Sequence, residues 1–283
     1  MKVTTAGGMP VILISIYSIN MHNTKQQLIQ TGLYPKKKLG QNFLIDTDIV
    51  PRVLSAAALN SIDTIVEIGA GTGALTREIA PIVSRLIALE FDRDLIPLLK
   101  KNTDTYNNVE IVNENALDFR PSDYALDDLR YKIIGAIPYN ITSPLLHHVM
   151  NVVSKPSTIV LIIQREVADK LTAMVPDATY LSTFFGTFAE IEIVKIIKPG
   201  SFYPAPSVDS ALITINLHNP QPDIDIPQWQ KFLHHGFMQP RKMINKRFEK
   251  DVLEKAGIDS NRRAQTLTGK EWRALYYALN MKV

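Results

Sequence analysis

The 283-residue chain contains no cysteine, which excludes disulfide bonds and thiolate metal sites. Its six histidines show no spacing typical of a metal centre, so we expect no bound metal. Long apolar runs are also missing, since Met9–Ile19, the most apolar stretch near the start, is too short to span a bilayer. One lysine precedes this stretch and no clear small-residue cleavage site follows it, so we expect neither a signal peptide nor a membrane partner.

Charge is present in ordinary amounts but is unevenly distributed. The chain is 46% hydrophobic and 21% charged, with a net charge of +3, as is typical of a soluble globular protein. From Pro199 on, 12 Lys and Arg oppose 8 Asp and Glu, a net charge of +4, which leaves −1 for the rest. This basic C-terminal third fits either a polyanionic partner or a plain solvated face. We further expect a cytoplasmic, monomeric protein.

The stretch Thr64–Thr76 carries the strongest local signal. An apolar run leads into Gly69, Gly71 and Gly73, and a helical pattern follows over Ala74–Ile82. This order predicts a buried strand, a tight turn and a helix N-terminus. In an open α/β sheet, nucleotide-like ligands bind at such a turn.

The glycine spacing fits more than one ligand. Gly69, Gly71 and Ala74 match the dinucleotide fingerprint, whereas the three glycines match the G-x-G-x-G of S-adenosylmethionine (SAM) methyltransferases. Glu67 favours SAM, because a carboxylate there would bind the methionine amino group and repel a pyrophosphate. Glu90 ends the next apolar run, where it would accept both ribose hydroxyls. A nicotinamide cofactor and a turn without a ligand remain the alternatives.

Strand and helix patterns alternate from the glycine turn to about residue 174, which predicts a mostly parallel sheet with helices on both faces. Two β-branched runs, Ile191–Ile197 and Ser210–Leu217, lack a helix between them, so the last strands are expected to be antiparallel. Beyond the proline-rich segment Asn219–Pro227, five helical patterns follow, at Gln228–Phe237, Arg241–Phe248, Asp251–Ala256, Arg262–Thr266 and Lys270–Leu279. We therefore expect an α/β domain at residues 28–218, a small all-α domain at residues 219–283, and a poorly ordered N-terminal extension at residues 1–27.

Two aromatic motifs are candidates for holding a flat base. Tyr139 lies in Ile137–Asn140 at the end of a predicted strand, where a tyrosine can stack on a base and the carbonyl before Pro138 can accept from an amine. Phe202–Ser210 adds a proline-held aromatic, suited to form a second wall for a flipped base. Each motif taken alone fits an ordinary turn with packed aromatics equally well. The lysines Lys36, Lys37 and Lys38 fit phosphate contact or a solvated run.

Together these motifs resemble the KsgA/RsmA ribosomal RNA adenine dimethyltransferases, which are related to the Erm methyltransferases. The resemblance covers roughly Leu28–Leu279, and its last two peptides favour the KsgA/RsmA branch. The matching peptides are L-G-Q-N-F-L (Leu39–Leu44), V-E-I-G-A-G-T-G-A-L-T (Val66–Thr76), L-E-F-D-R-D (Leu89–Asp94), I-P-Y-N-I (Ile137–Ile141), Q-R-E-V-A-D-K-L-T-A (Gln164–Ala173), F-Y-P-A-P-S-V-D-S-A (Phe202–Ala211), G-F-M-Q-P-R-K (Gly236–Lys242) and R-A-Q-T-L-T-G-K-E-W (Arg263–Trp272).

The resemblance implies a Rossmann-like SAM-binding sheet and methyl transfer from SAM to N6 of two adjacent adenosines near the 3′ end of small-subunit ribosomal RNA. It assigns the methionine end of SAM to Asn42 and Leu44, the ribose to Glu90, and the adenine ring to Asn115. Position 136, Pro138 and Tyr139 face the target amine, and Phe202 sandwiches the target base. The immature small subunit is the expected partner, with Arg241 and Lys242 of the basic C-terminal domain and Lys36–Lys38 on its RNA phosphates.

Two positions depart from the family pattern. The family usually has aspartate where this chain has Asn115, which keeps a carbonyl acceptor for the adenine amine but removes the charge. The family has asparagine where this chain has Ala136, so the side-chain oxygen that would accept from the target N6 is missing. A ribosome-assembly factor that binds the same RNA with little methyl transfer is therefore the alternative function.

Overall fold

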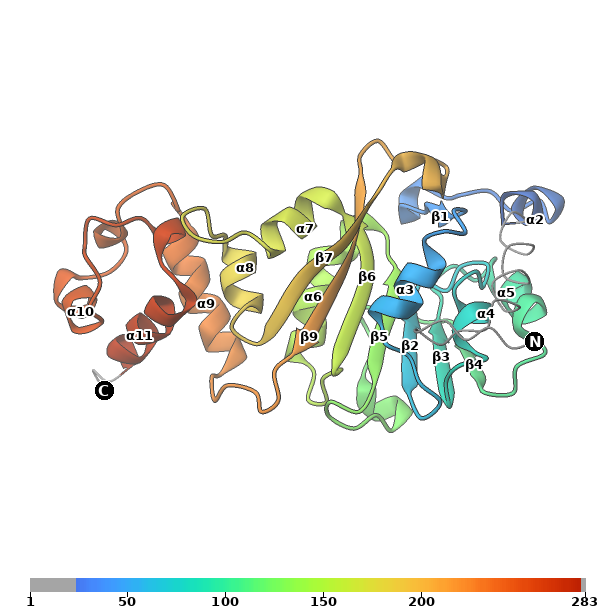
Figure 1. Cartoon of the computed structure of the whole chain (residues 1–283), viewed down its shortest axis with the longest axis horizontal. Coiled ribbons are helices and arrows are strands. Elements are labelled where there is room, and N and C mark those ends of the chain that lie inside the picture. The colour runs from blue at the N-terminus through green and yellow to red at the C-terminus, as the bar shows by residue number, and fades with distance from the viewer. Residues whose placement is uncertain (1–23, 281–283) are drawn as a thin grey trace, which may run out of the picture.

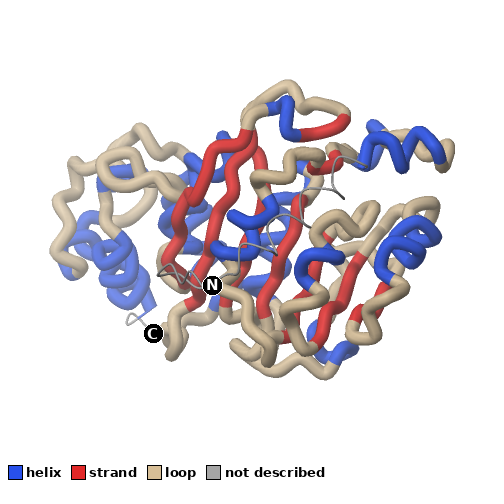
Figure 2. Tube along the Cα trace, turned by 45° about the vertical axis from the view of Figure 1, so that its right-hand side comes forward, coloured by secondary structure: helices blue, strands red, loops and turns tan. Residues whose placement is uncertain are grey.

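The computed structural model describes residues 24–280, so most of the expected N-terminal extension lies outside the described residues. A seven-stranded sheet with the order β4-β3-β2-β5-β6-β9-β7 forms its centre (Figures 1 and 2). The strands are β2 (Thr64–Ile68), β3 (Arg85–Leu89), β4 (Val109–Val112), β5 (Lys132–Ala136), β6 (Thr158–Gln164), β7 (Ala189–Ile197) and β9 (Ser210–Leu217). Strands β2 to β6 are parallel, and β9 runs antiparallel to both of its neighbours. The expected sheet with antiparallel last strands is confirmed.

Alternate strand residues enter two separate hydrophobic clusters, one on each face of the sheet, because successive side chains point to opposite faces. Ile65 packs in the cluster that contains residues of α3 and α4, whereas Val66 packs in the cluster that contains residues of α6, α7 and α8. The helices around the sheet are α3 (Val50–Ala56), α4 (Thr76–Ile79), α5 (Ile96–Thr103), α6 (Thr142–Asn151), α7 (Arg165–Leu171) and α8 (Tyr180–Phe185). Helix α8, which the sequence reading missed, begins with a capping box between Thr179 and Ser182.

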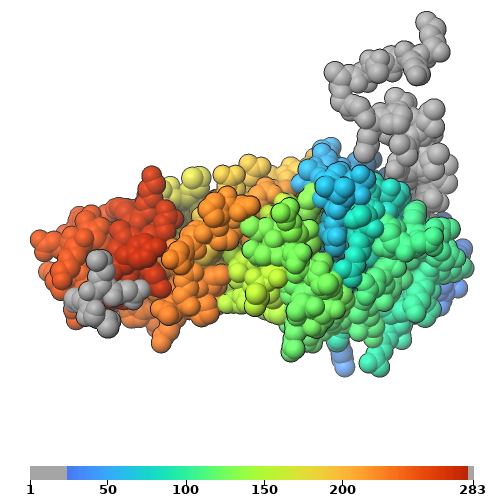
Figure 3. All heavy atoms as spheres, turned by 90° about the horizontal axis from the view of Figure 1, so that it is seen from below, coloured from blue at the N-terminus to red at the C-terminus, as the bar shows by residue number. Residues whose placement is uncertain are grey.

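The C-terminal helices α9 (Ile226–Phe237), α10 (Lys250–Lys255) and α11 (Gly269–Asn280) pack beside the β7–β9 end of the sheet (Figures 1 and 3). Their apolar side chains belong to the same continuous cluster as Val66 of β2, and Trp229 and Trp272 are fully buried in it. The core therefore crosses the proline-rich segment, where Ile224 is buried as well.

Three predicted helices are wrong in type or length. At the expected helices Arg241–Phe248 and Arg262–Thr266 the structure has only 3₁₀ turns, Ile244–Lys246 and Ala264–Thr266. The two segments hydrogen-bond to each other, with Ile244 N–H donating to the Arg262 carbonyl at 2.7 Å, so this N–H group and this carbonyl are not available for bonds within a helix. Helix α4 is shorter than predicted because tight turns precede it and Pro81 follows it.

A two-stranded ribbon joins distant parts of the chain at the edge where the parallel strands end. Strand β1 (Phe43–Leu44) pairs antiparallel with β8 (Phe202–Tyr203), which places Leu44 opposite Phe202. Helix α2 (Thr24–Gln30) precedes it, and the remaining short elements are the 3₁₀ turns Lys37–Leu39, Pro121–Tyr124, Tyr139–Ile141 and Pro199–Ser201. None of the helices within residues 24–280 is long and apolar enough to cross a membrane.

The packing of α9 against α11 depends on Gly236. A Cβ atom there would lie 2.4 and 2.6 Å from two ring carbons of the buried Trp272. We expect Gly236→Ala to lower the free energy of unfolding by about 1–3 kcal/mol through overpacking. The control Gly200→Ala, where a Cβ meets nothing within 4 Å, should change it by less than about 0.5 kcal/mol. Urea unfolding measures both, and equal midpoints for the two variants would contradict this account of the interface.

Candidate cofactor and substrate site

A cavity of about 270 Å³ opens at the carboxyl ends of β2, β3 and β5. Its lining includes every residue that the sequence reading assigned to the cofactor or to the target base: Asn42, Leu44, Glu67, Gly69, Gly71, Glu90, Asn115, Ala136, Pro138, Tyr139 and Phe202. These residues come from strands and loops up to 160 positions apart. Most of them meet because the carboxyl ends of parallel strands share one edge of the sheet, and the β1–β8 ribbon adds Leu44 and Phe202 at that edge.

The three glycines of the turn are required by its conformation. Gly69, Gly71 and Gly73 have φ values of 73°, 59° and 84°, a region that residues with a Cβ rarely adopt. A Cβ at Gly71 would also lie 3.4 Å from the ring of Phe43, and one at Gly73 would lie 3.0 Å from Leu99. The third glycine is therefore part of the turn, which fits the G-x-G-x-G interpretation better than the dinucleotide fingerprint.

Glu90 is buried, and both of its carboxylate oxygens accept backbone hydrogen bonds. Oε2 accepts from Gly71 N–H and Oε1 from Asp92 N–H, each at 2.7 Å. Burial raises the pKa of Glu90, and these two donors oppose the shift. Glu90 thus holds the glycine turn in addition to the ribose role expected from the sequence, and each oxygen keeps a second lone pair for a hydroxyl donor.

Glu67 supplies a second buried carboxylate at the cavity. Its side chain is 1% exposed, and its Oε2 atom has no hydrogen-bond partner. Burial raises the pKa of Glu67 to about 8, and the nearby carboxylate of Glu90 adds to the shift. A cationic ligand group in the cavity would favour the ionised form, so the site fits the ammonium group of an amino acid.

Asn115 has its side-chain oxygen turned toward the backbone. Oδ1 accepts from Leu117 N–H at 3.1 Å, which leaves the side-chain NH₂ group as the donor for a ligand. The oxygen keeps a second lone pair, so Asn115 can both accept from an adenine amine and donate to a ring nitrogen.

The expected base-binding wall is assembled from two sheet-edge loops. Tyr139 lies on the turn after β5, and its hydroxyl is 2.6 Å from Oγ of the buried Ser210. Phe202 is 5% exposed, and Ala136, whose side chain is only a methyl group, also lines the cavity. The sequence reading missed Ser210 as the partner of Tyr139, because nothing local to either residue signals the contact.

The basic residues lie in different surroundings. The ammonium of Lys36 forms ion pairs with Asp92 and Asp94. Lys37 and Lys38 are exposed, and Lys38 also lines the cavity. Arg241 and Lys242 are exposed at the far end of the molecule and form no ion pair with any described residue. Within residues 24–280, no cluster of acidic residues and histidine is arranged to hold a metal.

A model of a protein family described as ribosomal RNA adenine dimethylase matches residues 33–280 of the chain. The chain belongs to the ribosomal RNA adenine dimethylase family. This membership confirms the resemblance drawn from the motifs and rules out a nicotinamide oxidoreductase.

Relatives with curated names match nearly the whole chain. The ribosomal RNA small subunit methyltransferase A of Clostridioides difficile (strain 630) is 33% identical over 94% of this chain and 98% of its own length. The protein of the same name from Dehalococcoides mccartyi (strain CBDB1) is 32% identical over 94% and 95%, respectively.

Two solved structures share the fold of this chain at 24% identity. A dimethyladenosine transferase from Plasmodium falciparum aligns with a TM-score of 0.76 over 85% of this chain and 98% of its own. The 23S ribosomal RNA methyltransferase ErmE aligns with a TM-score of 0.69 over 84% and 100%. The expected methyltransferase sheet followed by a helical C-terminal region is confirmed.

The raised pKa of Glu67 makes stability depend on pH in a defined direction. The folded state holds this proton up to about pH 8, whereas the unfolded chain releases it near its usual pKa of 4.5. The stabilising contribution is therefore complete below pH 4.5 and is lost as pH rises to 8. Without ligand, Glu67→Gln should gain stability relative to the parent by on the order of 3–5 kcal/mol over that range.

Urea unfolding of both proteins at several pH values measures this difference, and groups that titrate in both cancel. A stability difference that does not vary with pH would show that Glu67 is ionised in the folded protein.

Proposed function

We propose that the protein transfers methyl groups from SAM to N6 of two adjacent adenosines near the 3′ end of small-subunit ribosomal RNA, each becoming dimethylated, during assembly of the small subunit. The observation that carries the proposal is the single cavity that joins the acidic glycine-turn site to the Pro138, Tyr139 and Phe202 wall. The names of the relatives support the RNA substrate.

The residues of the cavity fit the chemistry of this cofactor. SAM supplies an electrophilic methyl group on a positively charged sulfur. Glu67 is suited to hold the methionine ammonium, Glu90 to accept from the ribose hydroxyls, and Asn115 to donate to the adenine ring. Asn42 and Leu44, which also line the cavity, are suited to contact the methionine end.

On the substrate side, the protein has to orient one amine. Tyr139, held by Ser210 at 2.6 Å, and Phe202 offer aromatic faces between which an adenine can stack. The Pro138 carbonyl accepts from Ile141 N–H at 3.2 Å, so we assign the Ile137 carbonyl as the acceptor for the target amine. As N6 bonds to the methyl carbon, the carbon–sulfur bond breaks and the amine proton leaves to solvent. Holding the two reactants in line is the main contribution of the protein.

A ribosome-assembly factor with weak methyl transfer is the second candidate, and Ala136 favours it. An asparagine here would add a second acceptor, so that both amine hydrogens are held and the lone pair is freed from conjugation with the ring. Ala136 lines the cavity, and its methyl side chain offers no acceptor.

The test of both candidates is Ala136→Asn with Ala136→Leu as a control of similar size. A single preorganised transition-state hydrogen bond accounts for about 10²–10³ in rate, so Ala136→Asn should raise single-turnover methyl transfer to undermethylated small subunits by that factor. Affinity for the RNA should not change, because phosphate contacts dominate it. Equal rates for the parent and Ala136→Asn would show that the amide is dispensable. If neither protein transferred methyl groups, only the assembly function would remain.

RNA affinity should depend on the exposed cations of the C-terminal region. Reversing Arg241 and Lys242 to glutamate should weaken binding of small-subunit RNA and reduce the slope of log affinity against log salt by about 2. The matched control reverses Lys100 and Lys101 on α5, which are exposed and have no predicted RNA contact. Filter binding at several salt concentrations measures the slopes. If both pairs shifted the slope equally, general charge rather than this surface would explain the binding.

A further inference from the structure

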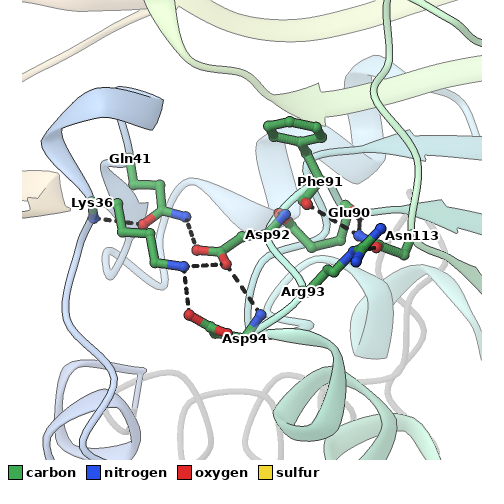
Figure 4. Close-up of polar contacts among 8 residues, drawn as sticks. All are labelled: Lys36, Gln41, Glu90, Phe91, Asp92, Arg93, Asp94 and Asn113. Carbon is green, nitrogen blue, oxygen red and sulfur yellow. Dashed lines mark hydrogen bonds and ion pairs between the residues drawn. The ribbon is translucent and has the colours of Figure 1, made fainter.

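Four polar residues join the start of the described chain to the loop after β3 (Figure 4). Lys36 Nζ lies 2.5 Å from Asp92 Oδ1 and 2.6 Å from Asp94 Oδ2. Gln41 Nε2 donates to the other oxygen of Asp92 at 2.8 Å, and its own Oε1 accepts from Lys36 N–H at 2.7 Å. We call Lys36, Gln41, Asp92 and Asp94 the clasp.

The Gln41 side of the clasp is continuous in sequence with residues that line the cavity. Residues 42–44 follow Gln41 without a break, and all three line the cavity. The Phe43 ring lies in van der Waals range of the position that a Cβ on Gly71 would take, so this segment forms the wall facing the glycine turn. Holding Gln41 therefore fixes the point from which the wall begins.

The other side of the clasp supports Glu90. Asp92 N–H donates to Glu90 Oε1 at 2.7 Å, while the Asp92 side chain accepts from Lys36, from Gln41 and from Asp94 N–H. One residue thus connects the lysine to the carboxylate that holds the glycine turn. Only two hydrogen bonds, from Lys36 to the Asp92 side chain and from Asp92 N–H to Glu90, separate the lysine from this carboxylate, so a displacement of Lys36 would also displace Glu90.

Burial separates the clasp from an ordinary surface ion pair. The Asp92 side chain is only 5% exposed, against 42% for Lys36 and 62% for Asp94. Burial opposes the ionisation of Asp92, but the hydrogen bonds from Lys36 and Gln41 lower its pKa below the usual value. Without the lysine, a buried carboxylate would lose its only cationic partner among the described residues, which is more costly than loss of an exposed pair.

We propose that Lys36 is a positioning residue of the cofactor site: through the clasp it holds the wall at residues 42–44 and the Glu90 loop in the geometry that binds SAM. The inference rests on the proposed function for the identity of the ligand. It replaces the phosphate contact expected for Lys36, because a lysine engaged with two carboxylates contributes little to RNA affinity.

The experiment compares Lys36→Met with Lys101→Met, an exposed lysine that forms no ion pair within the described residues. Lys36→Met should raise the KM for SAM about three- to tenfold, leave kcat at saturating SAM within about twofold, and leave RNA affinity unchanged. Lys101→Met should change none of these quantities. Lys36→Arg should restore most of the SAM affinity, since a guanidinium can span both carboxylates.

A second measurement does not depend on any ligand. Amide hydrogen exchange in the ligand-free protein should be faster at residues 39–44 and 90–94 in Lys36→Met, and unchanged in Lys101→Met and Lys36→Arg. Unchanged exchange in Lys36→Met would overturn the proposal, as would a loss of RNA affinity with an unchanged KM for SAM. A parent protein that binds no SAM would contradict the proposed function, while the exchange comparison would still decide whether the clasp orders these segments.

Discussion

The cofactor edge of this protein depends on one buried carboxylate, that of Glu90. Its two oxygens accept the N–H groups of Gly71 and Asp92, and so tie the turn after β2 to the loop after β3. Removing a carboxylate from water is unfavourable, and the backbone donors offset part of that cost. The glycine conformation is strained for any other residue, so the turn needs such a fixed acceptor to keep its shape before a ligand arrives.

The surroundings of Glu90 also define the charge that the cavity accepts. Glu67 lies within electrostatic reach, and two carboxylates in a buried site repel one another. A ligand with two positive centres relieves this repulsion, whereas a pyrophosphate increases it. In the proposed reaction the sulfur loses its positive charge, so the spent cofactor interacts less favourably with the same acidic cavity and its release is eased.

Much of the fold was predictable because its signals are local. Apolar, β-branched runs mark the strands, the glycine turn ends β2 at Ile68, and parallel strands necessarily place their carboxyl ends together. This geometry brought Glu67, Glu90 and Tyr139 to one cavity, as expected. The Lys36–Asp92 pair could not be predicted, because its partners are 56 residues apart and the lysine stands in a run that resembles an exposed phosphate-binding stretch.

In other segments the structure differs from the prediction because hydrogen bonds between residues far apart in the sequence override the local apolar periodicity. The apolar spacing of Arg241–Phe248 is helical, yet the N–H groups of Ile244 and Asn245 donate to the carbonyls of Arg262 and Ser260 instead of within a helix. Asn115 does show its local contact in the sequence, since asparagine commonly accepts from the N–H two residues on, as its Oδ1 does from Leu117 N–H.

The reversed direction of β9 has a topological consequence. In a wholly parallel sheet, each strand contributes only the loop after its carboxyl end to the ligand edge. Here Ser210, the first residue of β9, pairs with Gln164 and Ile197, the last residues of β6 and β7. The connection from β7 to β9 therefore leaves and re-enters the sheet at the ligand edge, as a hairpin loop anchored at both ends. Arg165 and Lys198 form ion pairs with Asp209 at the base of this loop. The loop that carries Phe202 is therefore fixed to the sheet at both of its ends.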